Sequence, residues 1–206
     1  MITIVDYGVG NVRAFSNVFL DLNIPFKIAT SAADLREATR LVVPGVGSFD
    51  ISIERFQNSP LFDAVSRLVT EVNVPTLGVC VGMQMFADSS EEGMANGLGW
   101  IGGRVRKISY PKSNTVLPLP HMGWNSIVAN KSTLFESLTS EDEFYFLHSY
   151  FFDCSERQNC AAIVEYGLSM PCVVQKENVI GVQFHPEKSH KSGATLLYNF
   201  ATRVIC

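Results

Sequence analysis

The feature that most limits the fold is an alternation, in the N-terminal half of the chain, of runs that are apolar throughout with segments of helical periodicity. The apolar runs are Ile2–Tyr7, Phe26–Ala29, Leu41–Val43 and Thr76–Val79. The helical segments are Val12–Leu22, Ser31–Thr39, Ile51–Gln57, Pro60–Val69 and Val81–Ala87. Strands that are apolar on both faces are typical of a parallel sheet covered by helices. The sequence therefore predicts an α/β fold with an open, mostly parallel central sheet and helices on both faces.

The pattern changes from Trp100 onward, where short strand-like runs follow one another without helices between them. These runs are Gly103–Ser109, Glu143–Phe152, Ala161–Tyr166, Cys172–Gln175 and Val179–Phe184. We expect them to form an antiparallel extension of the sheet, followed by a closing helix over Lys191–Val204. Because no repeat, low-complexity tract or linker interrupts the chain, residues 1–206 are predicted to form a single domain.

Composition excludes several classes of protein. Hydrophobic residues make up 47% of the chain and charged residues 17%, which excludes intrinsic disorder. The net charge of −4, with no basic block, argues against nucleic acid or an anionic membrane as a partner. The longest run without a charged residue contains three asparagines and a histidine, so we expect no membrane span. The five cysteines form no CxxC spacing, which predicts free thiols in a cytoplasmic protein and no metal site.

The segment around Cys80 carries the strongest chemical signal. Cys80 stands between Gly78 and Gly82 where a predicted strand passes into a predicted helix. This is the spacing of a nucleophile elbow, with cysteine in place of serine, and a helix N-terminus there favours the thiolate. The alternative is a buried structural cysteine on a glycine-rich turn.

A cysteine nucleophile needs a base and a group that orients the base. Among the four histidines, His185 stands out because Pro186 restricts it to an extended conformation and Glu187 follows two residues later. Residues two apart on a strand share a face, so His185 and Glu187 are expected to project together from a strand end toward Cys80. The alternative is a turn with an exposed acid.

Acyl transfer also needs hydrogen-bond donors for the developing oxyanion. The backbone amide of Val81 is one candidate, and the Pro44–Gly47 loop, at the end of another strand, is the second.

Two other features of the sequence do not indicate a functional site. Gly8 and Gly10 begin a dinucleotide-like pattern, but Arg13 occupies the position of the third glycine. His148, in an aromatic strand, is interpreted as a hydrogen-bonded core histidine.

The elbow and the His185-Pro186-Glu187 segment together resemble the class I (triad) glutamine amidotransferases. Further matching segments resemble the glutaminases of this family that serve histidine biosynthesis. These segments are Asp6–Asn11, Pro44–Phe49, His121–Asn125, His148–Tyr150 and Gly181–Ser189.

The resemblance implies a site and a partner. The implied triad is Cys80, His185 and Glu187, and the implied oxyanion loop is Gly45, Val46 and Gly47. The implied contacts to L-glutamine are Gln84, Glu92, Ser149 and Tyr150, and the implied partner-facing residues are Asn11, Trp124 and Lys188. The implied partner is a (β/α)8-barrel cyclase subunit that uses the ammonia to make imidazole glycerol phosphate and an aminoimidazole carboxamide ribotide. No cofactor is implied. Val81 departs from the leucine usual after the nucleophile, but the expected role belongs to its backbone amide.

Two alternatives stay open, and a third, a binding module, is disfavoured because Cys80 and His185 are both present. A paralogous glutaminase could feed a different synthase, for example one that amidates a surface sugar. A stand-alone cysteine hydrolase would act on other amides without a partner. A binding module on the same scaffold would not need Cys80 or His185.

Overall fold

The computed structural model describes residues 1–110 and 117–204 and has an eight-stranded central sheet within that part. The sheet has the order β2-β1-β3-β4-β13-β12-β11-β8. Its first five strands are parallel, and the last three are added antiparallel. The bounds of these strands are β1 (Ile2–Val5), β2 (Phe26–Ala29), β3 (Arg40–Gly45), β4 (Thr76–Cys80), β8 (Val128–Ala129), β11 (Cys160–Glu165), β12 (Ser169–Lys176) and β13 (Val179–Val182). The predicted mostly parallel sheet with an antiparallel extension is confirmed.

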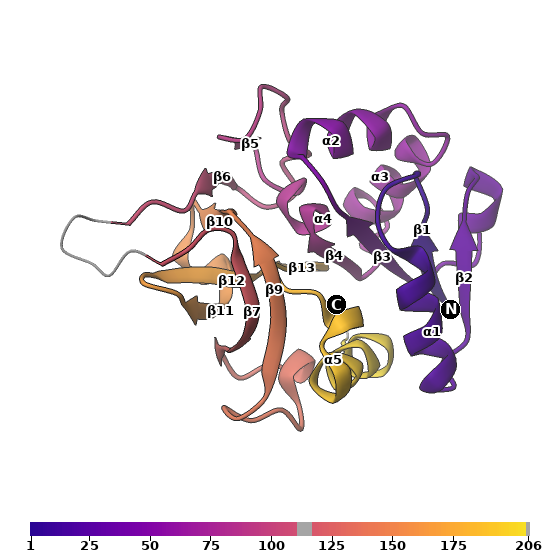
Figure 1. The fold of residues 1–206 in the computed structure, drawn as a ribbon. Helices are drawn as coiled ribbons and strands as arrows, with labels where there is room; N and C mark the ends of the chain where they lie inside the picture. Colours follow the sequence, from indigo (N-terminus) through magenta and orange to yellow (C-terminus); the bar gives the residue numbers. More distant parts are fainter. Residues whose placement is uncertain (111–116, 205–206) are drawn as a thin grey trace.

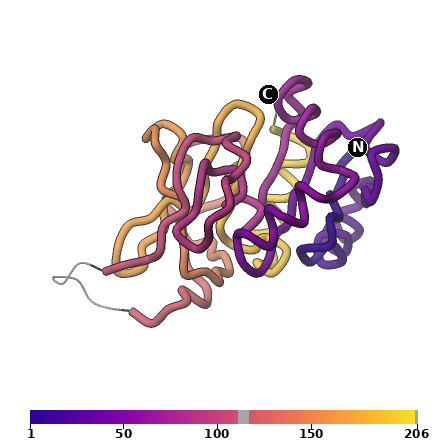
Figure 2. The backbone as a smooth tube through the Cα atoms, turned by 90° about the horizontal axis from the view of Figure 1, so that it is seen from above, coloured from indigo at the N-terminus to yellow at the C-terminus, as the bar shows by residue number. Residues whose placement is uncertain are grey.

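Helices cover both faces of this sheet (Figure 1). They are α1 (Val12–Asp21), α2 (Phe49–Gln57), α3 (Phe62–Thr70), α4 (Val81–Gln84) and α5 (His190–Thr202). In Figure 1, α2, α3 and α4 lie above the sheet, and α1 and α5 lie below it. Figure 2 shows the C-terminal helix returning against the N-terminal part of the chain. Helix α1 illustrates the common pattern, since it turns Phe15 and Phe19 into the core, where both are fully buried.

Two of the predicted helices are shorter in the structure. Over Ser31–Thr39 only a 3₁₀ turn, Ala32–Leu35, forms, because Thr39 must return to the start of β1, where its backbone N–H donates to the Met1 carbonyl. Helix α4 ends at Gln84 because the carbonyls that follow it accept hydrogen bonds from a later loop. That loop donates from Leu98 to Met85, from Ile101 to Phe86 and from Gly99 to Ala87.

Two of the strand-like runs, Gly103–Ser109 and Glu143–Phe152, do not extend the central sheet, and that part of the expectation is wrong. The run over 143–152 breaks at Ser149 into β9 (Glu143–His148) and β10 (Tyr150–Cys154). Strand β9 pairs with β7 (His121–Ser126), whereas β10 joins a three-stranded sheet with β6 (Gly103–Lys107) and β5 (Ser89–Ser90). The turns of 3₁₀ helix in this half are Thr133–Phe135, Arg157–Asn159 and η4 (Pro186–Lys188). The break at Ser149 therefore divides this run between two small sheets.

No helix in the described residues is both long enough and apolar enough to cross a membrane.

Asn178 fixes the position of β13 beside β4. It is 4% exposed, and its side-chain amide donates to the carbonyls of Val69, at 2.9 Å, and Val74, at 3.1 Å. Its own carbonyl accepts from the backbone N–H of Thr76 at 2.8 Å. The start of β13 is thus tied to the connection that leads into β4.

Replacement of Asn178 by Ala is expected to lower the free energy of unfolding by about 2 kcal/mol, because two buried hydrogen bonds from its side-chain amide are lost. Urea denaturation measures the change. Asn178→Asp, which has the same shape but no donor, should be comparably destabilised, and the exposed neighbour change Lys176→Ala should stay within about 0.5 kcal/mol of the wild type. Equal stability of Asn178→Ala and Lys176→Ala would contradict this account.

Candidate active site

Cys80 lies where β4 passes into α4, in a strained backbone conformation with φ 55° and ψ −113°. A residue with a side chain adopts positive φ only when its surroundings enforce it. Here a Cβ at Gly82 would collide with the Val43 carbonyl oxygen, and a Cβ at Gly78 would collide with the ring of Phe86. The two glycines of the predicted elbow therefore allow the turn to pack tightly against β3 and the core, and this packing holds Cys80 in place.

His185 and Glu187 meet as expected, with 2.9 Å between His185 Nδ1 and Glu187 Oε1. Both side chains are nearly inaccessible, at 4% and 2% exposed. The expected strand end is wrong, however, because β13 stops at Val182 and Glu187 lies in the 3₁₀ turn η4. This turn is anchored to β9, since the His185 N–H donates to the Tyr145 carbonyl at 2.8 Å.

The environment of His185 favours its protonated form. Burial alone would lower the pKa of His185, but hydrogen bonds and charge interactions with Cys80 and Glu187 outweigh this effect and raise the pKa to about 10. The imidazole is therefore placed between the Cys80 thiol and the Glu187 carboxylate. This is the arrangement of a nucleophile, a base and an orienting acid.

The Pro44–Gly47 loop lies beside the nucleophile because β3 and β4 pair in parallel, with Gly45 opposite Cys80. A Cβ at Gly45 would collide with the backbone N of Gly82, so only glycine lets the loop approach the elbow this closely. Gly47 has φ +91°, and a Cβ there would meet no atom within 4 Å. The loop is thus fixed at Gly45 and has open space at Gly47.

A cleft of about 450 Å³ opens at Cys80 and His185. Of the residues predicted for the oxyanion loop, for substrate contact and for partner contact, all except Gly45, Asn11 and Trp124 line this cleft. Those that line it are Val46, Gly47, Val81, Gln84, Glu92, Ser149, Tyr150 and Lys188. Glu92 also accepts a hydrogen bond from the Phe49 N–H at 2.8 Å, which ties it to the start of α2.

Gln183 is a site residue that the sequence reasoning missed. It is fully buried, its Nε2 lies 3.8 Å from Cys80 Sγ, and its Oε1 accepts a hydrogen bond from Gln84 Nε2 at 3.0 Å. The signal that could have found it is the alternation used for His185. Gln183 lies two residues earlier, and it is a polar residue in an otherwise apolar run.

His148 is hydrogen-bonded and only 6% exposed, as the core interpretation expected, but it also lines the cleft. That interpretation is therefore incomplete.

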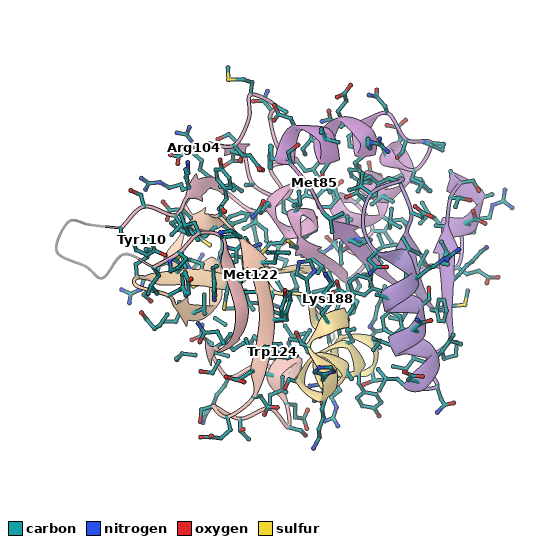
Figure 3. The ribbon with its side chains drawn as sticks, in the orientation of Figure 1. Met85, Arg104, Tyr110, Met122, Trp124 and Lys188 are labelled. Carbon is teal, nitrogen blue, oxygen red and sulfur yellow. The ribbon has the colours of Figure 1, made fainter. Side chains whose placement is uncertain are left out.

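The three residues expected to face a partner lie in different settings. Asn11 caps α1, and its Oδ1 accepts from the Ala14 N–H at 3.3 Å. Trp124, 43% exposed on β7, stacks on His190 with 5.0 Å between ring centroids. Lys188 lies over the Tyr145 ring, 5.8 Å from its centroid, and Tyr145 in turn contacts Trp124 edge-on. Figure 3 shows Lys188 and Trp124 on the same side of the molecule as Met122.

Within residues 1–110 and 117–204, no group of three or more His, Cys, Asp or Glu side chains is placed to hold a metal ion. Cys206 lies outside the described residues.

Comparison with known proteins gives a consistent family assignment. Residues 3–204 match the family model described as glutamine amidotransferase class-I. The chain is 46% identical over 203 residues to "Imidazole glycerol phosphate synthase subunit HisH" of Leptospira interrogans, covering 98% of this chain and 100% of that protein. It is 48% identical over 202 residues to the protein of the same name from Bdellovibrio bacteriovorus, covering 98% and 99% of the two chains.

Solved structures share the fold at lower identity. A putative GMP synthase protein from Thermoplasma acidophilum aligns with a TM-score of 0.70 at 21% identity, over 97% of this chain and 91% of that one. A crystal structure titled glutamine amidotransferase aligns with a TM-score of 0.73 at 19% identity, over 97% and 96% of the two chains.

Cys80 is expected to be alkylated by iodoacetamide at pH 7.5 at least about tenfold faster than Cys154, Cys160 or Cys172. Burial raises the pKa of Cys154 to about 12 and raises the pKa of Cys160 and of Cys172 as well, so these thiols stay protonated. Peptide mass spectrometry over time measures the rates.

The alkylation experiment uses the Cys206→Ser variant throughout, so that only described cysteines compete. His185→Ala should slow labelling at Cys80 and leave the other three cysteines unchanged. Faster labelling at Cys154 or Cys172 would contradict the assignment of Cys80 as the reactive thiol.

Proposed function

The chain belongs to the class-I glutamine amidotransferase family, and on that premise we propose that it is the glutamine-hydrolysing subunit of an imidazole glycerol phosphate synthase. In this function it converts L-glutamine and water into glutamate and ammonia. The ammonia passes to a (β/α)8-barrel cyclase subunit. The observation that carries the proposal is the contact of His185 with both Cys80 and Glu187 at the base of a cleft.

In the first half of the reaction Cys80 Sγ attacks the carboxamide carbon of glutamine. The thiol proton already resides on His185 before the attack, in keeping with the raised pKa of His185, and the carbonyl oxygen becomes an oxyanion. The Val81 amide and the Gly45–Gly47 loop, which borders the elbow, are the proposed donors to this oxyanion. His185 then gives its proton to the nitrogen, the C–N bond breaks, and ammonia leaves behind a thioester on Cys80.

In the second half, water attacks the thioester carbon and His185 takes a proton from that water. The carbon–sulfur bond breaks, glutamate is released, and the proton returns to Cys80. Glu187 holds the imidazole in the orientation that both halves need.

An exposed apolar surface beside the cleft supports the proposed docking of the cyclase. Met122, Trp124 and Leu147 are 64%, 43% and 38% exposed, and Met122 pairs with Leu147 across β7 and β9. Leu147 and Lys188 also line the cleft, so this surface is continuous with the place where ammonia forms. A partner seated there would cover the cleft mouth and could receive ammonia without its passing through bulk water.

The thiols support a reducing, cytoplasmic setting for this function. The four cysteines in the described part of the chain are all unpaired.

Replacement of Glu187 by Gln is expected to lower kcat about 10- to 100-fold, a milder loss than that of His185→Ala, because the base itself remains. Glu187 is one of the groups that raise the pKa of His185, so its removal lowers that pKa. The alkaline limb of the kcat/KM profile should therefore move to lower pH. An unmoved limb, or equal losses in both variants with altered circular dichroism, would point to a structural role for Glu187.

The proposed function itself is tested by measuring glutamate formation by the free chain, by its complex with the barrel cyclase, and by the complex with the acceptor nucleotide bound. We expect low activity in the free chain and a rise of about 10²–10³ in the liganded complex, the range associated with gaining one oxyanion donor. The open space around Gly47 is where such a donor could turn into place. Cys80→Ala should abolish turnover in every state.

The outcomes separate the open alternatives. Activation only by the barrel of a different pathway would identify a paralogous glutaminase, and full activity in the free chain on other amides would identify a stand-alone hydrolase. Turnover that survives Cys80→Ala would refute the proposed chemistry.

A further inference from the structure

Two buried histidines, neither of them part of the triad, form a hydrogen-bonded pair beside the cleft. His121 on β7 lies opposite His148 on β9 in the strand register. His121 Nδ1 is 3.0 Å from His148 Nε2, and His148 Nδ1 is 2.8 Å from the Tyr150 carbonyl oxygen. The two residues are 2% and 6% exposed, and only His148 lines the cleft.

Both rings are neutral at ordinary pH. Burial lowers the pKa of His121 to about 4. Burial is also the main reason that the pKa of His148 is lowered to about 3, with a smaller opposing contribution from its hydrogen bond to Tyr150. Each ring therefore carries one N–H group.

Neutrality fixes the direction of every hydrogen bond in the pair. The Tyr150 carbonyl can only accept, so the proton of His148 is on Nδ1. Its Nε2 is then an acceptor, which requires His121 to donate from Nδ1. The ring of His121 is held for this task between Phe146 and Tyr166, with centroid distances of 4.6 Å and 4.0 Å.

The Tyr150 carbonyl is shared with Gln84. Gln84 Nε2 donates to this carbonyl at 3.3 Å and to Gln183 Oε1 at 3.0 Å, which accounts for both of its N–H groups. Gln84 Oε1 is thereby the atom left to meet a bound molecule. Gln183 Nε2 in turn lies 3.8 Å from Cys80 Sγ. A chain of directed hydrogen bonds thus runs from β7 to the nucleophile.

We propose that His121 and His148 are positioning residues for glutamine binding, because they hold the Tyr150 carbonyl and, through it, the Gln84 amide in one orientation. This inference rests on the proposed function. It assigns a role to His121, a residue that does not reach the cleft. The role requires a donor at the Nδ1 position of residue 121.

Two substitutions at His121 separate the donor from the ring. His121→Phe keeps a flat ring between Phe146 and Tyr166 but has no donor. His121→Asn loses the ring but places its amide nitrogen where Nδ1 was. In the glutaminase complex we expect the KM for glutamine to rise about tenfold in His121→Phe, with kcat within about twofold of the wild type, since one buried hydrogen bond is lost from a binding wall. His121→Asn should keep the KM within about twofold.

A second series tests the route through His148. His148→Asn keeps a donor to the Tyr150 carbonyl that needs no partner, so adding His121→Phe to it should not change the KM further. Tyr166→Phe is the matched control, because it loses the hydrogen bond from Tyr166 to the Pro118 carbonyl but keeps its ring on His121. Its KM should equal that of the wild type. If His121→Phe fails to fold, His121→Gln, which moves the donor by one bond, supplies the same contrast with His121→Asn.

The outcomes distinguish this inference from the proposed function. A wild-type KM in His121→Phe, or an equal rise in His121→Asn and His121→Phe, would overturn the positioning role and leave only packing. Melting temperatures, recorded for each variant, should depend on whether residue 121 has an aromatic ring, and they should not correlate with the KM. Survival of glutamine hydrolysis in Cys80→Ala would instead refute the proposed function, whatever the His121 variants do.

Discussion

The close packing of the first turn of α4 against the end of β3 is the constraint on which the site depends. Gly45 and Gly82 meet there at backbone distance, with no room for a side chain on either. This contact forces Cys80 to a positive φ and places the Pro44–Gly47 loop beside it in the parallel register. The proposed nucleophile and its proposed oxyanion loop are therefore positioned by one steric fit between two strand ends.

The segment that follows the third strand of this group, β13, carries the proposed base, His185. Strand β13 lies parallel to β4, with Gly181 opposite Gly78, and the chain beyond it turns back through η4. The turn is held to β9 by the bond from His185 to Tyr145 and to α5 by the side chain of Ser189, which donates to the His185 carbonyl at 2.6 Å. The proposed triad thus joins elements from both halves of the chain, and its geometry depends on the small β7–β9 sheet as well as on the central one.

The side-chain nitrogens of three buried polar residues around the cleft each have a defined partner. Gln183, Gln84 and His148 all lie in the interior, where an unpaired polar atom is costly. Their hydrogen bonds converge on the Tyr150 carbonyl and on Cys80, which fixes the orientation of the cleft wall before any substrate binds. The exposed apolar residues of β7 and β9 adjoin this wall at Leu147, which lines the cleft.

The sequence by itself determined the architecture and the chemical groups of the site. Runs that are apolar at every position predicted the parallel strands, because a strand buried on both faces does not alternate between apolar and polar residues. The spacing Gly78, Cys80, Gly82 and the group His185, Pro186, Glu187 could be read locally, because each depends on a turn of a few residues. What only the tertiary structure decided involves distant partners. Helix α4 stops at Gln84 because the carbonyls that follow it accept hydrogen bonds from the loop over 98–101. The run over 143–152 divides at Ser149 because its halves pair with different strands. His121 is part of the site network only through its bond to a residue 27 positions away, and no local pattern encodes such a pairing.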